Sequence, residues 1–227
     1  MTPMEREELL NQLLIRWKQE HINRGYQRFI RDGAVCPQSW WSQDTPRVCF
    51  LLKEAYTERA SGYDLTDGLH KNGPWKMWKK AAVWTQAIHD AFSKPAAYNP
   101  DYIRTRERDL TDSIAIINVK KSNGQNMSSY NDLEKYARED RPKLEQQLEL
   151  LQPQVILCGN TFALLKIILG GDLKNENTWA DKIAFWKGAL VIDYYHPACQ
   201  YPNVVNYYAL SAICNIALKQ YGFSLTL

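Results

Sequence analysis

The stretch LEQQLELLQPQVILCGNTFALL, residues Leu144–Leu165, decides the fold class of this chain. It begins inside a segment of strong helical periodicity that covers Leu133–Leu151. The run QVILCG (Gln154–Gly159) follows, and its apolar residues without strict alternation are typical of a strand buried on both faces. A second helical pattern covers Thr161–Leu169. Helix, buried strand and helix in direct succession indicate a layered α/β protein.

Three further apolar runs and two further helical segments repeat this pattern. The runs are RVCFLL (Arg47–Leu52), SIAIIN (Ser113–Asn118) and ALVIDY (Ala189–Tyr194), and the helical segments are Trp75–Phe92 and Val204–Tyr221. Strands that alternate with helices form parallel sheets with helices on both faces. We therefore predict an α/β fold, a three-layer α/β/α sandwich around a central four-stranded parallel sheet.

The chain is predicted to form a single domain over residues 1–227. Of its 227 residues, 45% are hydrophobic and 23% are charged, and no repeat, linker or low-complexity tract divides them. An amphipathic helix predicted over Met4–Ile30 makes residues 1–45 an N-terminal helical extension. The net charge of +3 is weak, so nucleic-acid binding would depend on a local basic patch.

The five cysteines are scattered and include no C-x-x-C motif. This pattern argues against a disulfide framework or a structural zinc site and favours a reducing cytoplasm. The N-terminal sequence is acidic and helical, without the basic and apolar regions of a signal peptide. No apolar run approaches the length of a membrane span. We expect a cytoplasmic protein without a metal, a cofactor or a membrane partner.

Ligands of parallel α/β sheets bind beyond the carboxyl ends of the strands, which directs attention to the loops that follow the four apolar runs. The loops are Lys53–Tyr63, Val119–Ser129, Gly159–Phe162 and Tyr195–Asn203. In the first loop, Glu54 is placed either to orient or deprotonate a water or to cap the next segment as a surface acid.

In the second loop, polar residues follow the strand directly. Asn118 ends the apolar run, and its planar amide suits the edge of a base. The residues Lys120–Gly124 then form either a phosphate-contacting loop or an ordinary polar turn.

The third and fourth loops each contain one feature of interest. Asn160 precedes a helix, where it either caps the helix or marks an anion site, and capping is the simpler interpretation. His196 follows the fourth run, and the other three histidines show no ligand-like spacing with it. A nucleophile pair of His196 with Cys199 has an unfavourable spacing and no evident activator.

Taken together, these segments resemble the uracil-DNA glycosylase superfamily, and they are most similar to its bacterial type 4 branch, which carries an iron–sulfur cluster. Five motifs of that branch occur in order across Arg47–Cys214. They are Lys53–Thr57 in place of G-E-A-P-G, NGPW (Asn72–Trp75) in place of G-x-P-F, Asn118–Ser122 in place of N-V-x-K-C, the stretch Leu144–Leu165, and an intact Y-H-P-A at Tyr195–Ala198.

The resemblance implies a monofunctional DNA glycosylase that flips out a pyrimidine and hydrolyses its N-glycosidic bond. Glu54 would position or activate the attacking water, and His196 would stabilise the negative charge that develops on the base O2. Trp75 would stack on the flipped base and Asn118 would read its edge. The implied base-binding residues are Asn118, Trp75, Ala55 and Tyr56.

The same resemblance implies a set of DNA contacts. Gln200 or Tyr201 would fill the gap that the flipped base leaves. The implied DNA-binding residues are Ser61, Lys121, Ser122, Asn123, Gln200 and Tyr201. The partner would be DNA, bound by a monomer.

Two departures from the family pattern change what is expected. Ser122 and the segment Glu139–Pro142 replace cluster cysteines, so no iron–sulfur cluster is expected. Lys53 and Tyr56 replace the glycine and the proline of the first motif, which lines the pocket near the pyrimidine C5. The target is therefore either uracil or a modified cytosine, because an asparagine amide can flip to suit either edge. The superfamily includes bacterial enzymes that attack hypermodified phage bases, so antiviral defence is one expected role.

Two other functions compete with excision. A catalytically inert module on the same fold could recognise modified DNA, and the altered first motif favours it. An α/β hydrolase is disfavoured because the G-x-S-x-G motif after a strand is missing.

Overall fold

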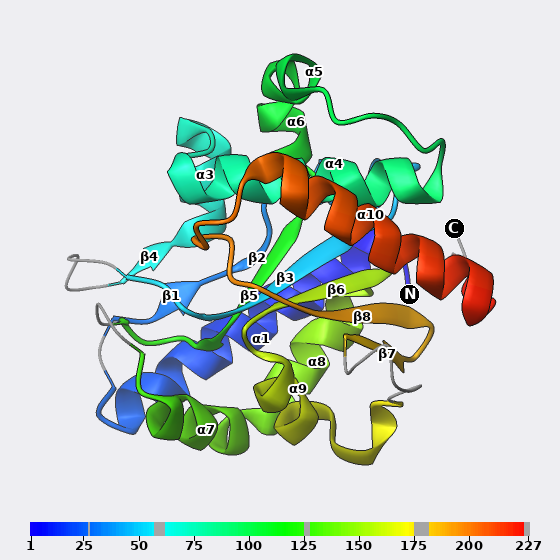
Figure 1. The fold of residues 1–227 in the computed structure, drawn as a ribbon. Helices are drawn as coiled ribbons and strands as arrows, with labels where there is room; N and C mark the ends of the chain where they lie inside the picture. Colours follow the sequence, from blue (N-terminus) through cyan, green and yellow to red (C-terminus); the bar gives the residue numbers. More distant parts are fainter. Residues whose placement is uncertain (27, 57–61, 125–127, 175–181, 225–227) are drawn as a thin grey trace.

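The computed structural model describes residues 1–26, 28–56, 62–124, 128–174 and 182–224. Its centre is a six-stranded sheet in the order β2-β5-β3-β6-β8-β7 (Figure 1). The strands are β2 (Gly33–Ala34), β5 (Ala115–Lys120), β3 (Val48–Glu54), β6 (Val155–Gly159), β8 (Ala189–Tyr194) and β7 (Ile183–Trp186). A separate parallel pair joins β1 (Ile30–Arg31) to β4 (Tyr63–Asp64).

The predicted α/β class is confirmed, but the sheet is six-stranded and mixed rather than four-stranded and parallel as the sequence predicts. β5, β3, β6 and β8 pair in parallel, whereas β2 and β7 are antiparallel to their neighbours at the two edges. β2 has two residues, too few for a periodic pattern. β7 joins β8 through Lys187 and Gly188, whose φ angles of 46° and 83° suit a two-residue hairpin turn.

Helices cover both faces of the sheet (Figure 1). On one face lie α3 (Leu65–Asn72), α4 (Lys76–Phe92), α5 (Pro100–Thr105), α6 (Glu107–Asp112) and α10 (Asn203–Gln220), and on the other lie α1 (Pro3–Asn23), α7 (Tyr130–Glu139), α8 (Arg141–Leu151) and α9 (Phe162–Leu169). Two short helices, α2 (Pro37–Ser42) and the 3-10 turn η1 (Gly170–Asp172), complete the described elements. Successive strand residues enter opposite cores: Phe50 packs with α4 and α10, and Leu51 with α1 and α8.

The long helix predicted over Leu133–Leu151 is two helices, because α7 ends at Glu139 and α8 begins at Arg141. Pro142 lies in the first turn of α8, where a backbone N–H has no partner within the helix. In the interior of a continuous helix, the missing N–H of Pro142 would cost one backbone hydrogen bond. In the parts of the chain that the structure describes, no helix combines the length and apolarity needed to cross a bilayer.

The N-terminal segment is part of the sandwich. The helix predicted over Met4–Ile30 ends at Asn23, and Gly25 follows with φ at 82°, a conformation that favours glycine. The segment after it supplies β1 and β2, and β2 extends the main sheet. Trp17 of α1 is fully buried in the core beneath the sheet.

Candidate functional site

The carboxyl ends of the four parallel strands meet at one edge of the sheet, on the left in Figure 1. In the register of the sheet, Leu52 of β3 pairs with Asn118 of β5, and Gly159 of β6 pairs with Tyr194 of β8. Glu54 follows Leu52 by two residues, and His196 follows Tyr194 by two residues. The sheet therefore brings the predicted acid, amide and histidine to the same edge.

Glu54 is the last residue of β3, and only 6% of its side chain is exposed. Its Oε2 lies 3.1 Å from Lys120 Nζ, while its buried Oε1 has no hydrogen-bond partner in the part of the chain that the structure describes. A Cβ on Gly124 would lie 2.7 Å from Glu54 Cγ and 2.9 Å from Cδ, so the Gly124 backbone lies directly against the carboxylate. A buried acceptor without a donor is costly unless a water or a substrate satisfies it.

Lys120, which the sequence places in a loop that is either phosphate-contacting or an ordinary polar turn, joins two acids at this edge. Its Nζ lies 3.1 Å from Glu54 and 2.6 Å from Asp132 of α7, and 5.4 Å from the centre of the Tyr136 ring. Burial opposes the charged ammonium, but the hydrogen bonds to Asp132 and Glu54 outweigh it and raise the pKa of Lys120. The lysine therefore supplies a fixed positive charge beside Glu54.

His196 is held as a neutral hydrogen-bond donor. The backbone N–H of Ala198 donates to its Nδ1 over 3.2 Å, which leaves the ring proton on Nε2 in the neutral form. Burial, together with the positive charge of Lys53, lowers the pKa of His196 to about 4. The histidine is thus uncharged at neutral pH.

Gly159 links the histidine to β3. A Cβ at this position would lie 2.6 Å from Leu52 Cδ2, 3.4 Å from His196 Cα and 3.6 Å from His196 Cδ2. The absence of a side chain lets these two residues approach the end of β6 from either side. His196 and the end of β3 are therefore neighbours across β6.

Asn118 is 1% exposed, and its orientation is set by Asp32. The Asp32 Oδ2 accepts from the Asn118 backbone N–H at 2.7 Å and from its Nδ2 at 3.1 Å. A carboxylate that only accepts must face the amide nitrogen. The expectation of an amide that flips between two orientations is therefore wrong for this structure.

The structure contradicts the prediction that the side chains of Lys121 and Ser122 contact phosphates, because both residues are buried. Lys121 is 0% exposed, pairs with Asp32 at 2.5 Å and lies 4.9 Å from the centre of the Trp17 ring. Burial lowers the pKa of Lys121, and Asp32 opposes that shift. The Ser122 hydroxyl donates to Tyr136 Oη at 2.7 Å. Neither side chain reaches the surface.

The remaining predicted DNA-binding residues lie in different environments. Asn123 is half-buried, Gln200 is exposed and Tyr201 is 49% exposed. The loop that carries the last two is anchored to α4, since Lys80 Nζ donates to the Tyr201 carbonyl at 3.2 Å and also to the Cys199 carbonyl. The predicted contact Ser61 lies outside the described residues.

The predicted base-binding aromatics are accessible. Trp75 is the N-cap of α4, is 44% exposed and makes an edge contact with Trp78 at 6.4 Å between ring centres. Tyr56 is 59% exposed, and Ala55 is half-buried against the core next to it. Ala55 and Tyr56 are the two residues that come after Glu54 in the chain.

Sequence reasoning missed Asp32 and Gln147, and it did not predict that Lys120 would pair with Glu54. Gln147 Nε2 donates to Asp32 Oδ1 at 2.9 Å, and its Oε1 accepts from Lys121 at the same distance. The signal for Gln147 was available, because it lies three residues after Leu144 and four before Leu151, on the apolar face of the helix. Asp32 carries no comparable signal.

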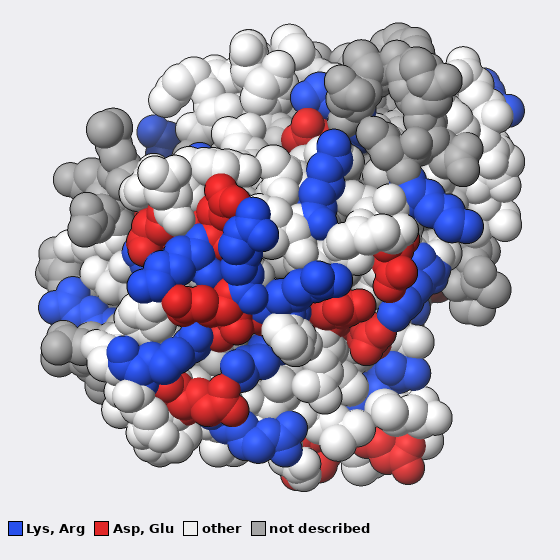
Figure 2. Space-filling view, turned by 90° about the horizontal axis from the view of Figure 1, so that it is seen from below, with Lys and Arg blue, Asp and Glu red and all other residues white. Residues whose placement is uncertain are grey.

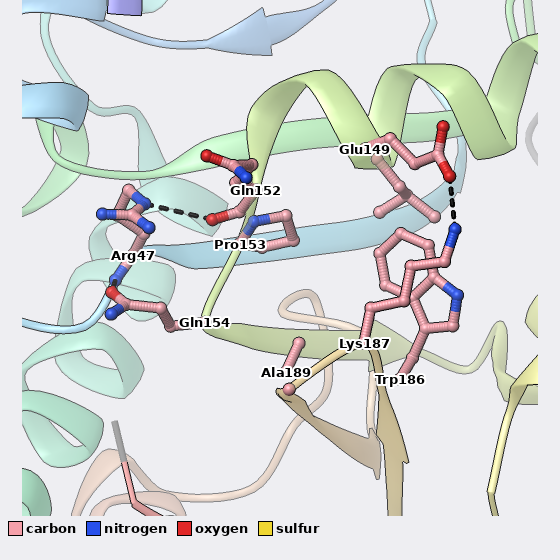
Figure 3. Close-up of a pocket in the computed structure, with 10 residues that line it drawn as sticks. Arg47, Glu149, Gln152, Pro153, Gln154, Trp186, Lys187 and Ala189 are labelled. Carbon is pink, nitrogen blue, oxygen red and sulfur yellow. Dashed lines mark hydrogen bonds and ion pairs between the residues drawn. The ribbon is translucent and has the colours of Figure 1, made fainter. Parts of the chain in front are cut away.

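A hollow of about 540 Å³ opens at the opposite end of the sheet (Figure 3). It is lined by residues that precede β3 and β6 and by the β7–β8 hairpin, including Arg47, Gln152 and Trp186. Its polar groups are partnered: Arg47 Nε donates to the Gln152 carbonyl at 3.0 Å, and Lys187 pairs with Glu149 (Figure 3). This hollow contains none of the predicted site residues.

The face formed by α1, α7, α8 and α9 has no single sign of charge. Figure 2 shows acidic and basic side chains interspersed across it. Pairs such as Arg24 with Glu139 and Lys143 with Glu20 account for this pattern. Among the described residues, no group of three or more His, Cys, Asp or Glu side chains is placed to hold a metal ion.

Comparisons with known sequences found no match for this chain. No protein-family model matches the chain, and no curated protein sequence does either.

Proposed function

We propose that this protein is a monofunctional DNA glycosylase of the uracil-DNA glycosylase type, which flips a pyrimidine out of DNA and hydrolyses its N-glycosidic bond. One observation carries the proposal. A buried carboxylate oxygen, Glu54 Oε1, has no hydrogen-bond partner among the described residues and lies at the same sheet edge as His196, a neutral histidine whose Nε2–H is the available donor. This pair suits a bond cleavage that separates positive charge on the sugar from negative charge on the base.

The two groups divide the chemistry between them. As the bond between C1′ and N1 breaks, the electron pair leaves with the base, and the Nε2–H of His196 donates to the base O2. The sugar becomes cationic, and Glu54 stabilises it and accepts a proton from the attacking water. The water oxygen bonds to C1′, which leaves an abasic site. A neutral histidine donates to the anion without a prior proton uptake.

The exposed aromatic residues around this edge support base flipping. Trp75, at the start of α4, would stack on the extruded base, and Tyr201 or Gln200 would fill the gap in the duplex. Lys80 holds the backbone of that loop to α4, so the wedge rests on a rigid support. Asn123 is the remaining described phosphate contact in the proposal.

The target is a pyrimidine, either uracil or a modified cytosine such as a hypermodified phage base. The exposed Tyr56 and the half-buried Ala55, directly after the catalytic acid, favour a pocket that admits a substituent at C5. Excision of such bases from invading DNA would make the protein an antiviral enzyme.

The proposal is tested by incubating the purified protein with matched single- and double-stranded DNAs that carry uracil, hydroxymethylcytosine or glucosylated hydroxymethylcytosine, and by measuring released base and abasic sites. We expect release from at least one substrate. Glu54→Gln and His196→Ala should each lower the rate by about 10²–10³-fold with the fold intact. Glu149→Gln, at the far end of the sheet, is the matched control and should leave the rate unchanged.

A second candidate is an inert module that recognises modified DNA on the same fold. The ion pair of Glu54 with Lys120 favours it, because that pair occupies one carboxylate oxygen. Binding to modified DNA without any abasic product, in the wild type as in Glu54→Gln, would select this function and reject the glycosylase.

A further inference from the structure

Asp32 is a buried carboxylate between β1 and β2, at the edge of the sheet next to β5. It is 1% exposed, and its two oxygens have different partners. The Oδ1 atom is held by Lys121 at 2.5 Å and by Gln147 at 2.9 Å. The Oδ2 atom accepts both the backbone N–H and the Nδ2 of Asn118.

These contacts leave the carboxylate no freedom to turn. Lys121 and Gln147 are themselves fully buried, and Lys121 Nζ also donates to Gln147 Oε1 at 2.9 Å. Rotation of Asp32 would separate a buried ammonium from its counter-ion, which is strongly unfavourable. One side of Asp32 is therefore anchored to α8 and to the end of β5, and the other side is presented to Asn118.

The contact to Oδ2 fixes which way the Asn118 amide faces. A flip would bring the amide oxygen against the carboxylate oxygen, two acceptors without a proton between them. The same Oδ2 binds the Asn118 backbone N–H, so it lies on the backbone side of the amide. Asp32 Oδ2 then accepts the Asn118 Nδ2 proton that lies on the Cβ side. The other Nδ2 proton lies next to the Oδ1 atom of Asn118, and together they form one donor–acceptor edge.

We propose that Asp32 is a positioning residue that sets base selectivity by locking this edge, an inference that rests on the proposed glycosylase function. A pyrimidine with a 4-oxo group presents a donor at N3 beside an acceptor at position 4. A pyrimidine with a 4-amino group presents the reverse order. A locked amide matches one order and leaves unpaired polar groups against the other, which is strong discrimination for a buried site.

The test compares pairs of substrates that differ only at position 4: uracil with cytosine, and 5-hydroxymethyluracil with 5-hydroxymethylcytosine. The readout is the ratio of kcat/KM within each pair. Asp32→Asn presents an amide that donates or accepts, so both orientations of Asn118 become available. We expect the ratio to fall at least tenfold, chiefly through faster release of the disfavoured base. An unchanged ratio would overturn the inference.

Two controls separate this role from a structural one. Gln147→Leu removes contacts to Asp32 Oδ1 and to Lys121 but none to Asn118, so it should lower stability and keep the ratio. Asp32→Asn combined with Lys121→Gln removes the buried charge as well as its partner, and it serves if the single variant does not fold. The side-chain amide protons of Asn118 give a further readout: we expect them to exchange with solvent slowly in the wild type and faster in Asp32→Asn, and equal rates in the two proteins would reject the lock.

The two proposals fail differently. If the wild type releases no base from any DNA, the glycosylase function fails. If the wild type is active and Asp32→Asn keeps its ratio, only the role of Asp32 fails.

Discussion

The two ends of the sheet differ in a way that their shapes do not reveal. The amino end has a hollow of about 540 Å³, yet Arg47, Glu149 and Lys187 in its wall all have partners. At the carboxyl end, Glu54 Oε1 has no hydrogen-bond partner within the described segments, and the pKa of His196 is lowered to about 4. The polar groups suited to chemistry therefore lie at the carboxyl end, where they are buried and where, among the described residues, their hydrogen-bonding capacity is not fully used.

Burial explains why ionic groups behave differently at the two ends. The side chains of Lys187 and Glu149 are 49% and 45% exposed, so water screens their attraction. Those of Lys121 and Asp32 are both 0% exposed. Four substitutions test this difference between the two ends.

The largest effect is expected from breaking the buried pair. Lys121→Met leaves the Asp32 carboxylate uncompensated in the interior and should lower the free energy of unfolding by about 3–5 kcal/mol. The equivalent Lys187→Met at the amino end should cost no more than about 1 kcal/mol. Urea denaturation of the two variants measures both values. Equal losses would show that burial does not distinguish the two ends.

A pH effect is expected from His89, which lies at the amino end against the Pro46 carbonyl at 3.2 Å. Burial lowers its pKa to about 4, below the unfolded value of 6.5. The unfolded chain therefore takes up the proton first as the pH falls, and stability is lost between these two values. Replacing His89 with Gln should remove about 2 kcal/mol of the difference in unfolding free energy between about pH 7 and pH 4.5.

The test for His89 is a series of urea midpoints across that pH range. His21 and His196, whose pKa values are also lowered to about 4, contribute equally to wild type and variant, so the difference isolates His89. Parallel pH curves for the two proteins would contradict the assignment.

A smaller effect is expected from Gly124. In Gly124→Ala the new Cβ would crowd Glu54 Cγ and Cδ, so the carboxylate must shift and the rate of base release should fall about tenfold or more, equivalent to about 1.4 kcal/mol. Gly171→Ala is the matched control, because nothing lies within 4 Å of that Cβ. Full activity in Gly124→Ala would remove Glu54 from the reaction.

The smallest effect is expected from the amino-end hollow. Arg47→Gln removes the cation from its wall, and base release should not change beyond the error of a steady-state assay. A large loss of activity with normal stability would move the functional site to this end of the sheet and would reverse the comparison.

Much of the layout could be predicted from local pattern. The four apolar runs are the four parallel strands, and Glu54, Asn118 and His196 lie at their carboxyl ends because parallel strands share one direction. The edge strands β2 and β7 escaped because two and four residues are too few to show a period.

The errors at the site share one cause. Lys121 was expected to contact DNA because the family resemblance implied it, and Lys120 was named only as part of the same polar loop. In the structure Lys121 faces inward to Asp32, and Lys120 serves Glu54. Neighbouring lysines are equivalent in composition, and only the direction of each side chain from the twisted strand end separates them.

The sequence by itself determined the order of the four parallel strands along the chain and the chemical groups that follow each of them, because these depend on periodicity and direction along the chain. The tertiary structure alone decided which of those groups are paired, neutral or locked. Asp32 meets Asn118 across 86 positions and Gln147 across 115. Such contacts depend on how distant segments pack. Packing also excludes water, and the lower local dielectric constant strengthens the interactions between the charged groups.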